Sequence, residues 1–263
     1  MSSPNESTAR TLLVALLVCL VCSVFVAGAA VALRPIQVEN SQLDKQRNIL
    51  AIAGIGDPSM SGPEVQALFN ERIIARLVDL ETGRFSDEYD AQTFDPVAAA
   101  KDPAMSKNLT GAEDIASINR RENYSVVYIV ENDNQEMETL ILPVRGYGLW
   151  STLHGFLALQ GDLNTVQGFG FYQHAETPGL GGEVDNPNWR GLWPGKEIFN
   201  DEGQLAIRVI KGNVDASNPN ADHQVDGLAG ATLTANGVNN LLHYWLSENG
   251  FGSFIDNLRS GEA

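Results

Sequence analysis

The sequence predicts an α+β protein in which a single N-terminal transmembrane helix precedes a globular domain with a mainly antiparallel sheet flanked by helices. Three observations predict this class: one long uncharged apolar run, a series of β-branched runs separated by polar turns, and amphipathic segments before and after them. We expect a short tail over residues 1–10, the membrane helix over 11–33, a helical connector and first lobe over 34–121, and a second domain over 122–263.

The membrane helix is predicted by TLLVALLVCLVCSVFVAGAAVAL, the run from Thr11 to Leu33, which has 23 residues and no charge. A helix of about 20 apolar residues crosses the hydrocarbon core of a bilayer. The two cysteines, Cys19 and Cys22, lie inside this run, so we interpret them as small apolar residues rather than a redox pair. Cleavage after VAGAA as a signal peptide is the alternative, although the run is longer than the usual apolar region of such peptides.

Two helical segments are expected between the membrane and the first strands. The stretch IQVENSQLDKQRNILAIAGI follows Pro35 and has the pattern of a short amphipathic continuation. SGPEVQALFNERII predicts a separate helix, because Ser61 suits the N-cap and Pro63 the first turn. The apolar residues at helical spacing in this second segment are Val65, Leu68, Phe69 and Ile73.

From Glu122 the pattern changes to strands. NYSVVYIVEND and METLILPVRGYG are apolar, β-branched runs parted by a polar turn, which predicts a hairpin. TLHGFLALQG and TVQGFGFYQHAET repeat the pattern, and LAIRVIKG is expected to add a further strand. The last predicted element is a helix, TANGVNNLLHYWLSENG, ended by Gly250. Its apolar face is expected to hold Val238, Leu241, Leu242, Trp245 and Leu246.

Composition and motif spacing exclude several classes of function. The chain has 33 acidic and 17 basic residues, a formal net charge of -16, which argues against nucleic-acid binding. None of the four histidines has the spacing that places two imidazoles on one helical face. We also find no nicotinamide-binding fingerprint, no cysteine set for an iron–sulfur cluster and no catalytic triad.

The stretch DGLAGATLTANGV, residues 226–238, is a glycine-rich turn that leads into the last helix. Such a turn exposes backbone N–H groups at the positive end of the helix dipole and attracts anions. A phosphate-binding Walker loop would have lysine where Ala231 stands, and the spacing of a dinucleotide fingerprint is absent. The structural alternative is that Thr232 or Thr234 only caps the helix, with Gly227 and Gly230 shaping the turn.

Four residues of this turn resemble the flavinylation motif D-x-x-[S/T]-G-A-T: Asp226, Gly230, Ala231 and Thr232. In that motif a flavin transferase joins FMN through its phosphate to the hydroxyl of the last threonine. The resemblance therefore implies that Thr232 carries covalent FMN, that Asp226 is the motif acid, and that no lysine clamp is needed. This chain has Ala229 where the motif has serine or threonine, so one hydroxyl, worth about 0.5–1.5 kcal/mol as a hydrogen bond, is missing.

A wider resemblance covers essentially the entire chain. The blocks LDKQRNILAIAGI, GYGLWSTLHGFLAL, HAETPGLGGEV and WRGLWPGK, together with the flavinylation turn, occur in the order found in the NqrC family, whose members are subunits of the sodium-translocating NADH:quinone reductase. The flavin-binding subunit of the related Rnf electron-transport complex shares the TPGLG block and the flavinylation motif, and is the alternative within the same class. A non-redox extracytoplasmic binding module is the alternative from another class.

The resemblance also implies which residues surround the FMN. Polar groups at the edge of the ring would come from the HAETPGLGG block, an apolar wall from the turn before TLHGFLAL, and a positive charge from the lysine after IRVI. The residues so implied are Leu149, Trp150, Ser151, His174, Glu176, Thr177, Gly179, Leu180 and Lys211. The structural alternatives are that Pro178, Gly179, Gly181 and Gly182 only make turns, that Trp150 is a core aromatic, and that Lys211 is an ordinary exposed lysine.

Partners and location are implied in the same way. Residues 122–263 would form the FMN-binding domain, which relays electrons without binding NADH itself. The expected partners are the other subunits of a membrane redox complex, among them a donor with an iron–sulfur centre and an acceptor with a second covalent FMN, and the flavin transferase. The chain would cross the bacterial inner membrane once with its domain in the periplasm. The charge pattern leaves that side open, because the positive-inside rule applies to short loops.

Overall fold

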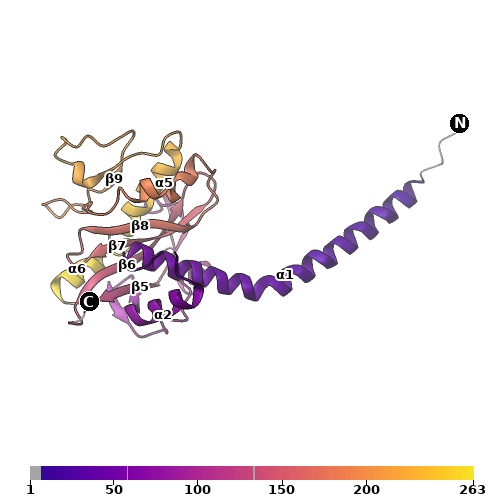
Figure 1. The fold of residues 1–263 in the computed structure, drawn as a ribbon, viewed down its shortest axis with the longest axis horizontal. Coiled ribbons are helices and arrows are strands. Elements are labelled where there is room, and N and C mark those ends of the chain that lie inside the picture. Colours follow the sequence, from indigo (N-terminus) through magenta and orange to yellow (C-terminus); the bar gives the residue numbers. More distant parts are fainter. Residues whose placement is uncertain (1–6, 58, 133) are drawn as a thin grey trace. The chain divides into compact units, whose positions relative to one another are not determined.

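The computed structural model describes residues 7–57, 59–132 and 134–263, and the chain forms two compact units, Met1–Asp44 and Lys45–Ala263. The first unit consists of helix α1 (Thr8–Ile52) up to Asp44 (Figure 1). Of the expected tail over residues 1–10, the first six lie outside the described residues.

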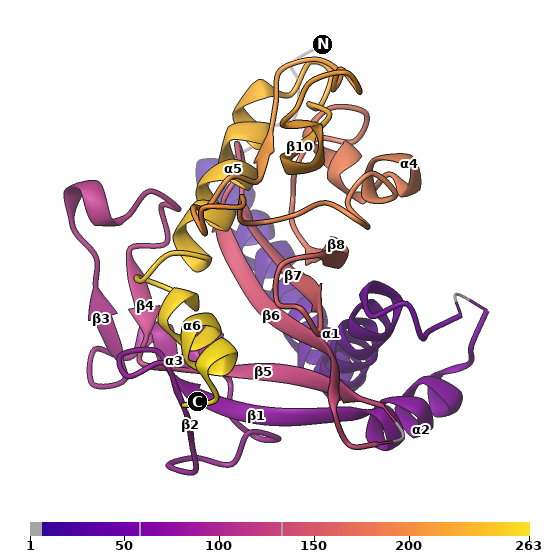
Figure 2. The same cartoon turned by 90° about the vertical axis from the view of Figure 1, so that its left-hand side faces the viewer.

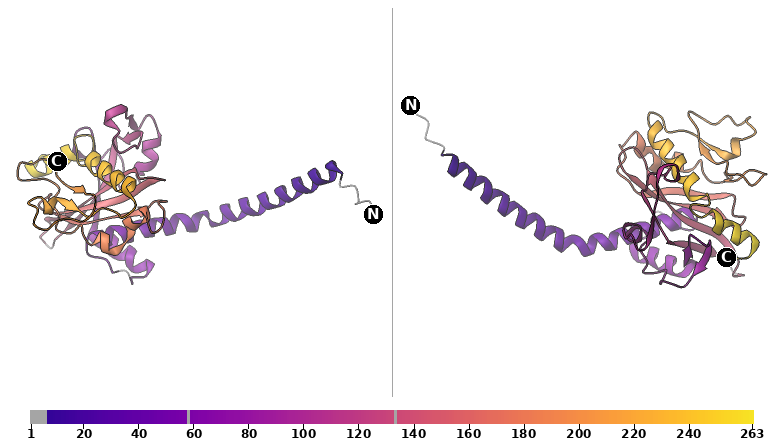
Figure 3. Two further views of the ribbon diagram at one scale, coloured as in Figure 1. Left: turned by 90° about the horizontal axis from the view of Figure 1, so that it is seen from above. Right: turned by 180° about the vertical axis from the view of Figure 1, so that it is seen from behind.

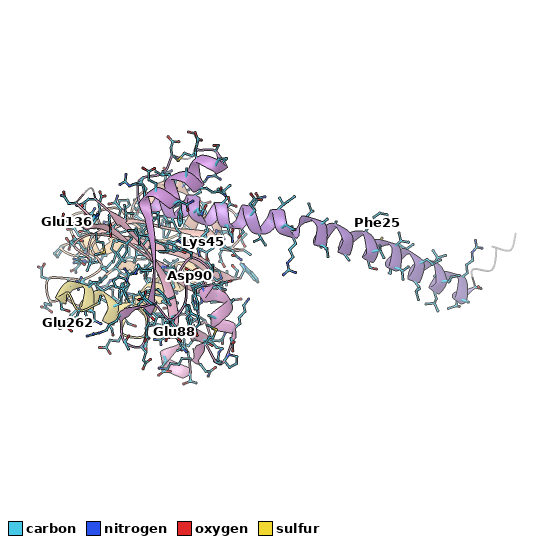
Figure 4. The ribbon with its side chains drawn as sticks, turned by 90° about the horizontal axis from the view of Figure 1, so that it is seen from below. Phe25, Lys45, Glu88, Asp90, Glu136 and Glu262 are labelled. Carbon is cyan, nitrogen blue, oxygen red and sulfur yellow. The ribbon has the colours of Figure 1, made fainter. Side chains whose placement is uncertain are left out.

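Helix α1 is long and apolar enough to cross a membrane. Its most apolar window has a mean hydropathy of 2.9, and none of that window is buried. Phe25, for example, is 74% exposed and points away from the helix (Figure 4). The helix also continues through Pro35 without interruption, as Figure 3 shows from two directions. The helical continuation expected after Pro35 is therefore confirmed, as part of the same helix, and residues 34–42 are exposed on all sides.

The second unit is built on a six-stranded sheet with strand order β2-β1-β5-β6-β7-β8, in which every neighbouring pair is antiparallel (Figure 2). The α+β class with a mainly antiparallel sheet is thus confirmed. The strands of this sheet are β1 (Ile73–Asp79), β2 (Arg84–Ser86), β5 (Tyr124–Glu131), β6 (Met137–Tyr147), β7 (Thr152–Gln160) and β8 (Val166–Gln173). Two small ladders are formed by β3 (Ser106–Asn108) with β4 (Arg120–Glu122), and by β9 (Arg208–Val209) with β10 (Gln224–Val225).

The α-helices of the second unit are short except for one. They are α2 (Gly62–Arg72), α3 (Pro96–Lys101), α4 (Pro187–Arg190), α5 (Thr232–Trp245) and α6 (Gly252–Ser260). Helix α2 begins as predicted, with Ser61 and Glu64 forming a capping box and a proline in the first turn. It ends one residue before Ile73, which the sequence analysis placed on the helix. That assignment is wrong, because Ile73 opens the β-branched run that pairs with β5.

Two further predictions need correction near the C-terminus. Gly250 does not end the last long helix, since α5 stops at Trp245 and a second helix, α6, follows. Gly250 lies in the turn between them, where a side chain would collide with the Trp245 backbone. The strand expected in LAIRVIKG shrinks to the two residues of β9, which pair in parallel with β10.

Helices α5 and α6 lie on one face of the sheet and close the main core (Figure 2). The predicted apolar face of α5 is confirmed, because all five of its residues are buried: Val238, Leu241, Leu242, Trp245 and Leu246. The helix approaches β6 closely, since a Cβ on Gly146 would lie 2.6 Å from the Cβ of Leu241. Nearer the start of α5, a Cβ on Gly237 would lie 2.5 Å from the Tyr147 carbonyl oxygen, so the first half of the helix lies beside the turn that joins β6 to β7.

The opposite face of the sheet is covered by the last turns of α1, from Lys45 onward. The Lys45 ammonium lies 5.6 Å from the centroid of the Tyr128 ring (Figure 4). Tyr128 and its buried neighbour Val127 point to opposite faces, because side chains alternate along a strand. Further along, Ile52 packs against Gly168 of β8. The sheet is therefore a middle layer between the end of α1 and the α5–α6 pair.

Candidate functional site

Three segments that are distant in the sequence meet at the start of α5. They are the turn between β6 and β7 (residues 148–151), the loop that follows β8 (174–182), and the glycine-rich turn before the helix (226–232). These three segments carry nearly all of the residues that the sequence analysis singled out. One carboxylate of the second segment connects the β6–β7 turn to the first turn of α5.

That carboxylate belongs to Glu176, which is only 5% exposed. Its Oε1 accepts hydrogen bonds from the backbone N–H groups of Leu149 (3.1 Å), Trp150 (2.9 Å) and Ser151 (3.2 Å). Its Oε2 accepts a hydrogen bond of 2.7 Å from the hydroxyl of Thr234, in the first turn of α5. Burial acts to raise the pKa of this carboxyl, but the hydrogen bonds from Thr234 and the three N–H groups hold its pKa below the usual value.

The glycines around Glu176 leave no room for a side chain. A Cβ on Gly148 would lie 2.7 Å from the Glu176 Oε1, and a Cβ on Gly181 would lie 2.5 Å from the Thr234 Oγ1. Both positions therefore require glycine because of packing, and not because of an unusual backbone angle. The interpretation of Gly181 as a residue that only makes a turn leaves out this contact.

His174 and Ser151 fold the loop after β8 onto the β6–β7 turn. The Nδ1 of His174 accepts a hydrogen bond from the Glu176 N–H (3.1 Å), and its Nε2 lies 2.7 Å from the Oδ2 of Asp185. This arrangement assigns the ring proton to Nε2. The hydroxyl of Ser151 accepts a 2.7 Å hydrogen bond from the Ala175 N–H. The hydrogen bonds of both side chains are thus with the protein's own backbone, with Asp185 and, from the Ser151 hydroxyl at 3.4 Å, with Glu176.

Thr232 is the first residue of α5 and is exposed. The N-cap is Ala231, and no side chain caps the helix. The alternative in which Thr232 or Thr234 serves as the cap is therefore wrong, because Thr234 donates to Glu176 instead. The N–H groups of the first turn point out from the helix end beside the Thr232 hydroxyl, which is the arrangement that attracts an anion.

The turn before α5 is held by contacts on its other side. The Oδ1 of Asp226 accepts a 2.7 Å hydrogen bond from the Val214 N–H, and its carbonyl accepts one of 2.9 Å from the Trp189 indole. Gly230 has a φ of +71°, a conformation that suits glycine, and packs against Leu180. Asp226 therefore shapes the turn rather than facing solvent. Lys211 is exposed on the adjoining loop, between β9 and the residues that contact Asp226.

Large apolar side chains are exposed around this helix start. Trp150 is 66% exposed and Leu233 is 58% exposed, and Leu149 and Leu180 are exposed as well. The interpretation of Trp150 as a core aromatic is therefore wrong. Thr177 and Gly179 are also found in the loop after β8, where Gly179 is exposed. A group of exposed apolar side chains beside polar backbone groups is typical of a binding site for a flat, partly apolar molecule.

Sequence reasoning missed two residues here. Leu233 was not considered, and Thr234 was considered only as a cap. The available signal was their position next to Thr232, since residues one and two places into a helix must flank whatever binds at its first residue. Nothing local indicated the contact of Thr234 with Glu176, which are 58 positions apart.

Comparisons with known proteins agree with this geometry. Residues 148–247, which span all three segments, match the FMN-binding domain family. The chain is 68% identical to the NqrC subunit of the Na(+)-translocating NADH-quinone reductase of Pseudomonas aeruginosa, over 98% of this chain and 99% of that protein. It is 47% identical to the protein of the same name from Vibrio alginolyticus, over 100% and 99% of the two chains.

Solved structures of proteins with the same name are also similar to this chain. The crystal structure of NqrC from Shewanella oneidensis is similar with a TM-score of 0.74 and 34% identity, covering 82% of this chain and 96% of that one. The crystal structure of the corresponding protein from Parabacteroides distasonis is similar with a TM-score of 0.64 and 29% identity, covering 85% and 96%. This chain therefore belongs to the NqrC family, whose members are subunits of the Na(+)-translocating NADH-quinone reductase.

Proposed function

We propose that this chain carries FMN covalently, through a phosphoester to the Thr232 hydroxyl, and relays electrons between other subunits of a sodium-translocating NADH:quinone reductase. The observation that carries the proposal is the exposed hydroxyl of Thr232 at the start of an uncapped helix. A phosphate esterified there would lie against the free N–H groups of the first turn of α5. The residues present thus fit the phosphate end of FMN.

The choice of Thr232 over its neighbour follows from hydrogen bonding. The hydroxyl of Thr234 is buried and donates to Glu176, so it is not accessible to a transferase. Thr177 lies outside the helix start, where no row of backbone N–H groups would hold the phosphate. We expect Thr232 alone to be modified.

The exposed apolar side chains support a site for the ring. Leu149, Trp150 and Leu180 surround the helix start on segments that Glu176 and Gly230 hold in place. Their apolar surface would exclude water from part of the isoalloxazine ring. Lys211, on the adjoining loop, is the positive charge that we assign to the N1 and C2 carbonyl edge, where it would stabilise the reduced form.

FMN supplies reversible transfer of single electrons when it is bound. The chain's own part is to fix the cofactor by its tail, to shield one side of the ring, and to leave the reactive edge facing a partner. We propose a donor subunit with an iron–sulfur centre, an acceptor subunit with a second covalent FMN, and a flavin transferase that modifies Thr232. We further propose that α1 anchors the chain in the bacterial inner membrane, with the second unit in the periplasm.

Acid precipitation tests the proposal. The chain is produced in a host that has the flavin transferase, precipitated with acid and washed, so that only covalent flavin stays in the pellet. We expect the wild-type pellet to absorb near the flavin bands and the Thr232→Ala pellet to be colourless. A colourless wild-type pellet would contradict covalent attachment and would favour a non-redox binding module.

A further inference from the structure

A cavity of about 220 Å³ lies within the second unit, between the last turns of α1, the segment that follows it, and the end of α4. Two arginines line it, Arg47 from α1 and Arg190 from α4, and we refer to it as the arginine pocket. Its apolar wall comes from Leu50, Met60 and Val65. None of these residues contributes to the segments around Thr232.

The guanidinium of Arg190 lies against the sheet. It lies directly over the main chain of β8 at Gly170, where a Cβ would come within 2.8 Å of its Nε and Nη2 atoms. The neighbouring Trp189 is buried, and its indole donates to the Asp226 carbonyl. The backbone from which Arg190 extends into the pocket lining is therefore fixed.

The guanidinium of Arg190 has no hydrogen-bond acceptor and no acidic partner among the residues that the structure describes. This is unexpected in a chain with 33 acidic and 17 basic residues, where a carboxylate could easily have been placed beside it. The Arg190 residue is partly exposed and none of its side-chain nitrogens is both buried and unpartnered, so water hydrates its donors until an anion displaces that water. A guanidinium left in this state is prepared for an anion from outside the chain.

The other side of the pocket carries a second guanidinium and one carboxylate. The Nη2 of Arg47 donates to the carbonyl of Met60 at 3.2 Å, which holds its guanidinium at the pocket wall. The acid in the lining, Asp57, accepts hydrogen bonds from the N–H and the hydroxyl of Ser59 through its Oδ1, both at 2.7 Å. That carboxylate oxygen is thereby occupied by donors of its own loop.

We propose that the arginine pocket binds a phosphate group carried by a small molecule or by a lipid. Two guanidinium groups on different segments can approach different oxygens of one phosphate, whereas a carboxylate is satisfied by a single forked contact. The apolar wall of Leu50, Met60 and Val65 suits the carbon part of a phosphate ester. The pocket is independent of the FMN proposed on Thr232, so each can fail without the other.

Phosphate titration tests the proposal. The full-length chain in detergent is titrated with sodium phosphate in a calorimeter and in thermal unfolding, with sodium chloride at equal ionic strength as the reference. We expect phosphate to bind and to raise the melting temperature beyond chloride. Arg190→Gln should weaken binding at least about tenfold, which corresponds to about 1.4 kcal/mol. Arg208→Gln, at an exposed arginine of β9, is the matched control and should change nothing.

Stability without phosphate shows whether a variant is merely misfolded. Arg190→Gln should unfold close to the wild-type temperature, because its side chain loses no protein partner. Arg190→Lys keeps the positive charge but loses the two parallel N–H donors of the guanidinium, and should bind phosphate with intermediate affinity. Equal phosphate affinity in wild type and Arg190→Gln, or no effect beyond chloride in wild type, would overturn the proposal.

A lipid comparison identifies the source of the phosphate. The chain is placed in nanodiscs of phosphatidylglycerol or of a galactolipid that has no phosphate. If inorganic phosphate binds in galactolipid nanodiscs but not in phosphatidylglycerol nanodiscs, the lipid headgroup already occupies the pocket, which would support a lipid as the natural ligand. Binding in both would support a soluble phosphate compound. Absence of phosphate binding in the intact complex would show that another subunit fills the pocket, and would overturn the proposal.

Discussion

The hydroxyl of Thr234 donates a 2.7 Å hydrogen bond to the carboxylate of Glu176, so the first turn of α5 is tied to the loop after β8. Through the same carboxylate, α5 is tied to the β6–β7 turn. Thr232, two residues earlier on α5, is positioned by this arrangement but takes no part in it. Glu176 therefore acts by positioning the segments around the helix start.

Removing the charge of Glu176 should destabilise the second unit. In Glu176→Gln an amide nitrogen, which can only donate, replaces one carboxylate oxygen. Either the Thr234 hydroxyl or the three backbone N–H groups then lose their acceptor. We expect a loss of about 1–3 kcal/mol in the free energy of unfolding, measured by chemical denaturation. Glu202→Gln, at an exposed glutamate, is the control. Equal losses in the two variants would contradict a structural role for the Glu176 carboxylate.

Placing an additional side-chain atom beside Glu176 should also destabilise the second unit. Gly181→Ala places a Cβ 2.5 Å from the Thr234 hydroxyl and 2.7 Å from the Glu176 Oε2, so one of these groups must move. We expect about 1–3 kcal/mol of destabilisation and a shift in the visible circular dichroism of the bound flavin. Gly179→Ala is the comparison, because its Cβ meets nothing within 4 Å and only its φ of +76° opposes the change. If Gly179→Ala altered the flavin spectrum more than Gly181→Ala, the packing argument would fail.

A partly buried histidine, His154, should make stability depend on pH. Burial, followed by the positive charges of Arg145 and Lys101, lowers the pKa of His154 to about 4. In the unfolded chain the same ring titrates near about 6.5, so the unfolded state binds more protons between these two values. The free energy of unfolding should therefore fall as the pH decreases from about 6.5 to about 4, by up to about 1.4 kcal/mol per pH unit from this group.

The measurement is chemical denaturation of wild type and His154→Gln at several pH values in that window. His154→Gln should remove part of the slope that the wild type shows. His223→Gln, in which the lost ring is hydrogen-bonded to the Glu197 carbonyl, is the matched control. Superimposable slopes for wild type and His154→Gln would show that folding does not lower the pKa of this ring.

Local patterns in the sequence were sufficient for much of the fold. The uncharged run, the hairpin of β5 and β6, the capping box of α2 and the buried face of α5 were all predictable, because each depends on residues close together in the chain. Ile73 was misassigned because helical spacing extended one residue into the β-branched run of β1. Gly250 was misread as a helix stop because close packing against Trp245 also requires glycine.

The site was predictable only in part. Thr232 was identified from four residues of one turn, and its exposure at the helix start agrees with that choice. The functions of Glu176 and His174 could not be read from their block, because their partners Trp150, Thr234 and Asp185 come from three other places in the chain. Unpaired donors such as those of Arg190 leave no trace in a sequence at all.

The most direct test of covalent attachment is the mass of the tryptic peptide that runs from residue 212 to 259, between Lys211 and Arg259. The chain is produced with the flavin transferase, and the peptide is compared between wild type, Thr232→Ala and Thr234→Val. We predict one FMN, added with loss of water, on the wild-type and Thr234→Val peptides and none on the Thr232→Ala peptide. A wild-type peptide with the mass of its amino acids alone, or an adduct that persists in Thr232→Ala, would contradict attachment at Thr232.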